Sequence, residues 1–455
     1  MTGLNPGQLA ESASRPGLPR LVLALLILIF ATSSFDVFLN LRLGGFSLRF
    51  CYLLILLFAF VYAPKLHLLA LRPPSVPGWP ALLLWTAFLL VFIPNTHYLP
   101  RNIGYMAWHL IHLLFLFLFV EVINQTVTLR FLFKAYVLTY VGVAAFGLIQ
   151  FAAGLAGIGI LVTQWWIDGR LPRINGFSYE PSYYGSYLII GWIILFTLFR
   201  MDNGLFTRRQ VKWMLALTTA SLLLSSSRMS IVVASVFVCA GLATALFRLA
   251  ITLRIARAWI AIALIFFVGS ISATVTVASH WNQYKFLFQG LGVGGTASHS
   301  TVQRYERLWE TVDVFWRSPF IGVSLGGIPS AIADARHILI SSNEDAKSFE
   351  GSNIFAEVLS ASGIIAFPFF CVWLAITLAM PLRLLRARWG ALFPDQRPIL
   401  ASLLLGLIFE LIILSMNQNI LRAFLWIHIA LLAVACKLAR RAMRDGDENA
   451  MERAA

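Results

Sequence analysis

The sequence has few charged residues for its length, and this scarcity decides the class of protein. Asp, Glu, Lys and Arg make up 12% of the 455 residues, whereas soluble domains contain about 25%. Apolar residues make up 59%, and the mean hydropathy is +0.80. The composition therefore excludes a soluble enzyme and a disordered chain. The four cysteines are also too sparse for a secreted disulfide scaffold.

Long apolar runs take the place of charge. A helix needs roughly 20 apolar residues to cross about 30 Å of hydrocarbon, and its backbone groups must pair within the helix. The sequence therefore predicts an all-α polytopic membrane protein, a single integral domain over 1–455, with about 12 transmembrane helices. We expect the spans at residues 21–39, 50–63, 81–94, 105–123, 131–154, 183–199, 213–224, 229–249, 258–279, 363–380, 399–416 and 421–437.

The basic residues indicate how the chain is oriented. Lys and Arg outnumber Asp and Glu by 35 to 20. Because they cluster between apolar runs, they favour membrane lipids over nucleic acid as partners. Most of them fall on the side of the N-terminus, which is the positive-inside pattern. We therefore expect cytoplasmic tails at 1–20 and 438–455, and a large loop on the outer side at 280–352.

The first long outer loop, at about 155–182, combines aromatic and basic residues. It contains Trp165, Trp166, Arg170, Arg173 and Glu180. The two Trp side chains suit either stacking on a sugar or anchoring at the membrane interface. Guanidinium groups hold phosphate through paired hydrogen bonds. This loop therefore predicts contact with an anionic, lipid-borne substrate.

The second outer loop, 280–352, contains a pattern typical of an amphipathic helix. It begins at a Ser/Thr cap near Ser300 and ends at Pro319, because Pro cannot continue a helix. We expect this helix to lie on the helix bundle at the outer membrane face. Its apolar stripe at helical spacing consists of Val302, Tyr305, Trp309, Val312 and Trp316.

Three further arginines belong to the outer side. Arg228 lies in a serine-rich turn between two expected spans, and a polar cluster at the rim of a bundle indicates a cavity. Arg304 and Arg307 are three residues apart on the amphipathic helix and so project from one side. A single Arg at a span end is also a common lipid anchor, and a helix can carry Arg for solvation alone.

In their order and spacing, these motifs resemble the O-antigen ligase/polymerase family of integral membrane glycosyltransferases. The resemblance extends over roughly residues 170–426. The segments that carry it are Arg173–Gly185, with the sequence RINGFSYEPSYYG, the Ser226–Arg228 turn, Arg304–Trp309 followed by Ser318–Val323, and Ser352-Asn353 followed by Gly363. The ligases of this family carry a His where this chain has Ser352, so we favour a polymerase over a ligase.

The resemblance implies a GT-C-like fold in the bacterial inner membrane, with the active site and the 280–352 loop on the periplasmic side. The implied donor is an undecaprenyl-diphosphate-linked oligosaccharide, and the implied partners are membrane lipids, a chain-length regulator and a flippase protein. No cofactor or metal is expected, because guanidinium groups can stabilise the departing diphosphate.

The site residues follow from this expected chemistry. Those expected to be catalytic are Arg228, Arg173, Glu180 and His337. Glu180 is the first candidate for the general base, and His337 and Glu350 are second candidates. Those expected to hold the diphosphate are Arg170, Arg173, Arg228, Arg304 and Arg307. Those expected to contact sugar are Trp165, Trp166, Tyr183, Ser352 and Asn353. Glu180 could equally form a salt bridge with Arg173 or Arg170.

A polysaccharide transporter or flippase is the alternative from another class, because carriers place charged residues near the bilayer midplane. Glu410, in the eleventh expected span, is such a residue. Alternatively, Glu410 forms a hydrogen bond with a partner inside the helix bundle.

Overall fold

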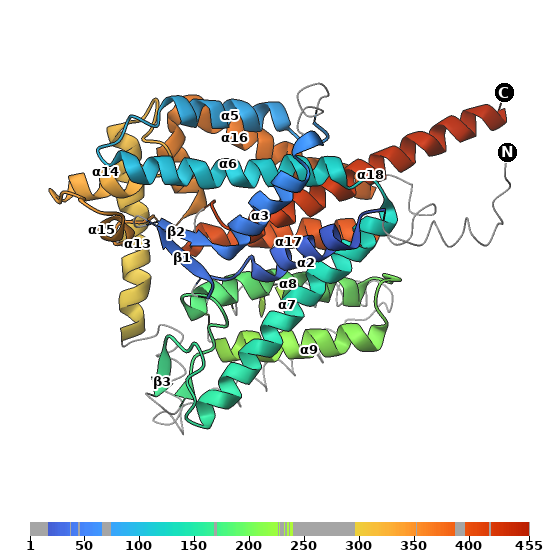
Figure 1. The fold of residues 1–455 in the computed structure, drawn as a ribbon, viewed down its shortest axis with the longest axis horizontal. Coiled ribbons are helices and arrows are strands. Elements are labelled where there is room, and N and C mark those ends of the chain that lie inside the picture. The colour runs from blue at the N-terminus through green and yellow to red at the C-terminus, as the bar shows by residue number, and fades with distance from the viewer. Residues whose placement is uncertain are drawn as a thin grey trace, which may run out of the picture.

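The computed structural model of the chain is a mostly helical bundle (Figure 1). It describes residues 17–36, 38–43, 46–65, 74–167, 171–225, 227, 232, 234–235, 237–239, 296–351, 353–386, 396–417 and 420–454.

Six helices in the described part of the chain are long and apolar enough to cross a membrane. They lie within α6 (Leu99–Val122), α7 (Thr126–Leu155), α8 (Pro181–Arg200), α16 (Ile354–Arg386), α17 (Gln396–Asn417) and α18 (Ala423–Ala454). Three shorter apolar helices are α2 (Arg20–Thr32), α3 (Phe50–Val61) and α5 (Trp79–Val91). The length and apolar composition of these helices thus indicate an all-α membrane protein.

The number of spans stays a prediction. The expected span 258–279 and most of 229–249 lie outside the described residues. Helix α9 (Arg208–Ser225) covers the expected span 213–224, but it begins with a basic turn. The first expected span, 21–39, is wrong at its end, since α2 stops at Thr32 and a hairpin follows.

Proline marks the beginning of several helices. It lies in the first turn of α5, α6, α8 and α14 (Ile328–Ala335), as Pro80, Pro100, Pro181 and Pro329. The first-turn N–H groups have no partner within a helix, so Pro loses no hydrogen bond there. Pro181 thus explains why α8 begins two residues before the expected sixth span, 183–199.

The smaller elements gather at one end of the bundle, which we call the loop end (left in Figure 1). They are β1 (Asn40–Leu43) with β2 (Phe46–Arg49), β3 (Trp165–Ile167) with β4 (Leu171–Pro172), α13 (Thr296–Arg317), α14 and α15 (Asn343–Lys347). Both strand pairs are antiparallel. The 3-10 turn η1 (Ala63–Lys65) follows α3.

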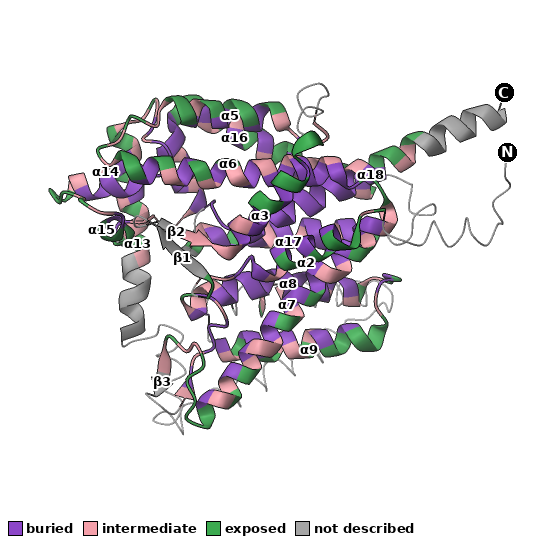
Figure 2. Cartoon of the chain, viewed as in Figure 1, coloured by how far each residue is buried: buried purple, intermediate pink, exposed green. Residues whose placement is uncertain are grey.

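The long helices α8, α17 and α18 form the core, whereas α5 and α9 lie at the periphery (Figure 2). Lipid provides little hydrophobic force between helices, so close packing must hold the bundle together. At Gly191 of α8 the ring of Tyr140 occupies the space that a side chain would need. The central helix is therefore held by shape rather than by apolar character alone.

The amphipathic helix of the outer loop exists as α13, which lies crosswise at the loop end (Figure 1). The expectation that its aromatic stripe packs on the bundle is wrong. Tyr305, Trp309 and Trp316 are more than half exposed. The buried side is formed by Thr311 and Val314, and the Ser360 hydroxyl of α16 donates to the Thr311 carbonyl at 2.6 Å. Contact with α16 decides which side of α13 faces inwards.

A break in α16 receives the segment after α13. At Gly363 the backbone has φ 58° and ψ −176°, a region open essentially to Gly alone. The amides of Val323 and Ser324 donate to carbonyls of α16, and the Ile364 amide donates to the Pro319 carbonyl at 2.8 Å. The break therefore exposes backbone groups that fasten the outer loop to the bundle.

We expect Gly363→Ala to lower the free energy of unfolding by about 2–4 kcal/mol, because the added Cβ strains the backbone and overlaps Phe320. Thermal unfolding of the detergent-solubilised protein measures the effect. Gly142→Ala is the control, since nothing lies within 4 Å of a Cβ there, and it should change stability by less than about 1 kcal/mol. Equal effects of the two substitutions would contradict this account of the break.

Candidate functional site

The loop end carries a cluster of charged side chains built on Asp36. Its carboxylate lies between two guanidinium groups, 2.9 Å from Arg49 and 3.3 Å from Arg422. Asp36 follows α2, Arg49 ends β2, and Arg422 precedes α18. Residues far apart in the sequence thus meet at one point. Arg422 is only 8% exposed, so its charge is largely shielded from water.

Arg422 also contacts the segment that precedes α8. Its guanidinium lies over the Tyr183 ring, 4.5 Å from the centroid, which is a cation–π contact. Glu180 is the residue before Pro181, and it accepts a hydrogen bond from Ser182 at 2.9 Å. The segment Glu180–Tyr183, expected from the sequence to act in catalysis and sugar contact, therefore borders the Asp36 cluster.

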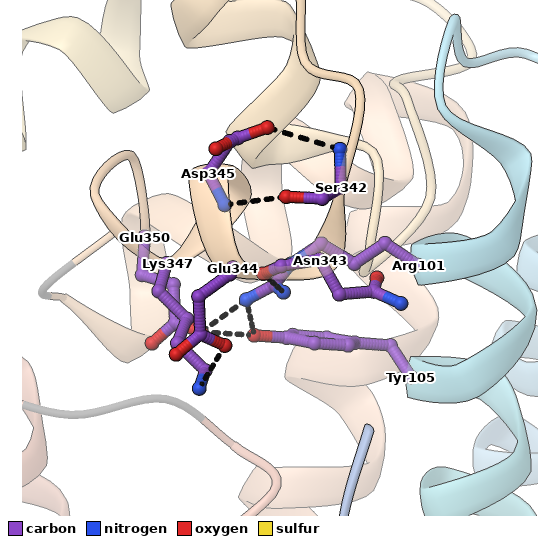
Figure 3. A network of polar contacts seen from close by, with 8 residues as sticks. All are labelled: Arg101, Tyr105, Ser342, Asn343, Glu344, Asp345, Lys347 and Glu350. Carbon is purple, nitrogen blue, oxygen red and sulfur yellow. Dashed lines mark hydrogen bonds and ion pairs between the residues drawn. The ribbon is translucent and has the colours of Figure 1, made fainter. Parts of the chain in front are cut away.

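A second group of contacts ties α6 to the outer loop (Figure 3). Arg101 donates to the Asn343 carbonyl and to the Tyr105 hydroxyl, both at 3.0 Å, and forms an ion pair with Glu350. The Tyr105 hydroxyl donates to the same carboxylate at 2.9 Å. Because Arg101 is only 5% exposed, these contacts lie in the interior of the protein, where they hold the outer loop against the bundle.

The short helix α15 shapes this part of the loop (Figure 3). Ser342 and Asp345 form a capping box in which each side chain accepts a hydrogen bond from the other's backbone amide, at 3.1 Å in both directions. Hydrogen bonds from Ser342 and Ser341 hold the pKa of the Asp345 carboxyl below its usual range. The cap fixes the beginning of α15 and so fixes the Asn343 carbonyl that Arg101 binds.

Electrostatic interactions join the two groups. Burial lowers the pKa of the Arg49 guanidinium, but attraction by Asp36, Tyr52 and Glu350 outweighs this effect and leaves the pKa raised. Glu350 therefore acts on both Arg101 and Arg49. We call the set Asp36, Arg49, Arg101, Tyr183, Glu350 and Arg422 the loop-end cluster.

Among the sugar-contacting residues expected from the sequence, Asn353 has a structural role. Its side-chain oxygen accepts from the amides of Phe355 and Ala356 and thereby caps α16. Its amide group donates to the Ser415 carbonyl at 2.5 Å, which ties α16 to α17. Trp165 lies half-buried in β3, where a Cβ on Gly159 would touch its ring.

The expected diphosphate ligands occupy several positions. Arg173 donates to Gln164 at 2.8 Å across the first outer loop. Arg307 lies 3.4 Å from Glu310 and 5.7 Å from the Phe349 ring centroid. Arg304 is partly buried on the same helix, α13. Arg170, Arg228, Ser352 and the side chain of Trp166 lie outside the described residues.

His337 terminates helix α14. Its φ is 59°, its amide donates to the Asp334 carbonyl at 3.0 Å, and the Ile338 amide donates to the Ala333 carbonyl at 2.9 Å. This is a Schellman motif, which requires a left-handed residue after the helix. The backbone geometry of His337 therefore has a structural cause, and its side chain is exposed.

Sequence reasoning missed four members of the loop-end cluster. In the sequence, the three arginines look like ordinary positive charges at the ends of spans: Arg49, Arg101 and Arg422. Asp36 looks like an isolated acidic residue. A buried guanidinium needs a partner, so an Arg directly before the apolar run of α18 was a signal that could have been used. The partner itself, 386 residues away, has no trace in the local pattern.

Glu410 has the partner inside the bundle that one interpretation of the sequence required. Its carboxylate lies 2.8 Å from Nδ1 of His428, and both residues are fully buried. His428 Nε2 is 2.8 Å from the Leu403 carbonyl, which can only accept, so Nε2 carries a hydrogen. The contact links α17 to α18.

Comparison with known proteins adds no identification: no family model matches the sequence, and no curated protein matches it significantly. In the described part of the chain, no three His, Cys, Asp or Glu side chains gather closely enough to hold a metal ion.

We expect Arg101→Met to release the 343–350 segment, because the substitution removes the ion pair and both hydrogen bonds of the guanidinium. Amide hydrogen exchange in this segment should be at least about tenfold faster, equivalent to roughly 1.4 kcal/mol of local stability. Lys347→Met removes an exposed pair with Glu344 and should leave exchange nearly unchanged. Exchange at the wild-type rate in Arg101→Met would contradict the anchoring role.

Proposed function

We propose that the protein is a membrane glycosyltransferase that polymerises a surface polysaccharide, such as O-antigen or an exopolysaccharide. It transfers a glycan from undecaprenyl diphosphate to a lipid-linked repeat unit at the periplasmic face of the bacterial inner membrane. The observation that carries this proposal is the position of Arg422, a buried guanidinium beside Asp36 and over Tyr183. It adds a cation to the segment that the family resemblance assigns to the site.

The proposed reaction is a substitution at the anomeric carbon of the donor. A sugar hydroxyl of the acceptor forms a bond to this carbon, the bond to the diphosphate oxygen breaks, and the diphosphate leaves with the electron pair. Negative charge grows on the leaving group, so guanidinium groups held in place stabilise the transition state more than the ground state. Because they supply the positive charge, the reaction as proposed needs no metal ion.

The loop-end cluster supplies such preorganised charge. Asp36 and the Tyr183 ring fix Arg422 before any substrate binds, and partial burial strengthens its field. Arg228 and Arg173 remain the proposed companions from the adjoining outer loops. Glu180 is the proposed base that receives the proton of the acceptor hydroxyl, since it is joined to the beginning of α8 beside Tyr183.

The outer loop is the proposed cover of the sugars. It is fastened by Arg101 at Asn343 and Glu350, and by the break in α16 at Gly363. A cover of this kind excludes water, which otherwise competes with the acceptor hydroxyl.

A polymerisation assay with purified protein and a lipid-linked repeat unit tests the function. Longer glycans formed without lipid A-core support the polymerase. Transfer only when lipid A-core is present supports the ligase instead. Movement of the substrate across a liposome membrane without elongation supports the transporter, and the proposal is then wrong.

In this assay Arg422→Ala should lower the rate about 10²–10³-fold, because loss of one preorganised donor removes transition-state stabilisation. Arg228→Ala should have a similar effect. Arg422→Lys should retain part of the activity, since the charge remains and the planar contact with Tyr183 is lost. Arg336→Ala is the matched control, because Arg336 is 45% exposed and pairs with Glu310 outside the loop-end cluster. Full activity of Arg422→Ala in folded protein would remove Arg422 from the site.

Glu180→Gln should lower the rate about 10²–10⁴-fold at neutral pH, because a neutral amide cannot accept the proton. Glu344→Gln is the control, as its side chain is 62% exposed on α15. A folded Glu180→Gln enzyme with the wild-type rate would eliminate Glu180 as the base.

A further inference from the structure

The contacts of Asp36 differ from those of a tightly bound ion pair. Nη1 of Arg422 is 3.3 Å from both carboxylate oxygens. Charge-assisted hydrogen bonds are usually 2.7–2.9 Å long, and a bidentate pair uses two nitrogens for two oxygens. The contact with Arg49, at 2.9 Å, has the usual length. Asp36 thus neutralises Arg422 through two long hydrogen bonds from a single nitrogen.

Arg422 retains unused donor capacity. Its Nε is buried and has no hydrogen-bond partner among the described residues, and the side chain is about nine-tenths buried. A buried donor without a partner is unfavourable by about 1–3 kcal/mol. The guanidinium is nevertheless fixed, because it lies on Tyr183 and because the neighbouring Leu421 carbonyl accepts from Tyr52 at 3.2 Å. The group is therefore held ready for an acceptor with more oxygens than one carboxylate offers.

The charges of this group do not cancel. In the loop-end cluster Arg49, Arg101 and Arg422 carry three positive charges, and Asp36 and Glu350 carry two negative ones. A doubly charged anion with several oxygens would match both guanidinium groups better than Asp36 does. The Asp36 carboxylate can leave by rotation about its own side-chain bonds, while its amide stays bonded to the Phe177 carbonyl at 3.1 Å.

We infer that Arg49 and Arg422 form a binding site for a diphosphate, and that Asp36 occupies this site as an internal counter-ion until the diphosphate displaces it. The choice of diphosphate as the natural anion rests on the proposed function. Occupation by Asp36 offsets part of the positive charge of the two guanidinium groups when no substrate is bound. It also lowers the apparent affinity for other anions, because only the fraction of molecules with Asp36 displaced is competent to bind.

Binding of inorganic pyrophosphate to the full-length protein in detergent, measured by calorimetry, tests this inference. Asp36→Asn keeps the size of the side chain and removes its charge. It should bind pyrophosphate about tenfold more tightly than wild type, because the competing carboxylate is gone. Arg422→Met should bind at least about tenfold more weakly. Asp334→Asn is the matched control, an acid on the same end of the bundle that pairs with His97, and it should bind as wild type does.

A different result of the Asp36→Asn measurement would overturn the inference. If Asp36 only positions the two arginines, Asp36→Asn will bind pyrophosphate as weakly as wild type or more weakly, and the inference is overturned. A variant counts only if its melting temperature matches wild type, and Asp36→Ser replaces Asp36→Asn if the latter is unstable. If Asp36→Asn binds pyrophosphate more tightly but the wild-type protein elongates no glycan, the role of Asp36 as a counter-ion is supported and the proposed polymerase function is wrong.

Discussion

The arrangement of the protein depends on one constraint: a charge that is removed from water must have a partner. The sequence is short of charge, so each buried ion must find its partner across the bundle. Arg422 and Arg49 meet at Asp36, Arg101 meets Glu350, and Glu410 meets His428. The contacts of Arg422 with Asp36 and of Arg101 with Glu350 join elements that are distant in the sequence, and Glu410 and His428 join two successive helices. The charges that the membrane tolerates least therefore also fix the packing of the helices.

This constraint brings structure and proposed chemistry together. In the core the Glu410 carboxylate lies beside His428, whereas the loop-end cluster has one more guanidinium group than carboxylates, with Arg422 beside Tyr183. By the inference above, an anion balances this excess of positive charge when it binds. The same residues therefore serve as fasteners of the outer loop and as a candidate site for a negatively charged, lipid-linked substrate.

Several elements were predictable because their signal is local. Pro181 after an outer loop predicts the beginning of α8, and Pro319 predicts the end of α13 close to Arg317. The expected span beginning at Gly363 marks a real event, although the helix starts earlier, at Ile354, and only breaks there. The buried side of α13 was not predictable: Tyr305 and Trp309 form the more apolar stripe, yet Thr311 and Val314 face α16. Backbone contacts at the break overrule the hydrophobic pattern.

The sequence by itself determined that the chain is a helical membrane protein, because low charge and long apolar runs leave the backbone no other way to pair in lipid. It also marked the segment Glu180–Tyr183 through motif and Arg content. Only the tertiary structure decided which charges meet there. Asp36, Arg49 and Arg422 are brought together by the packing of α2, α3 and α18, and no local pattern encodes a contact that spans most of the chain.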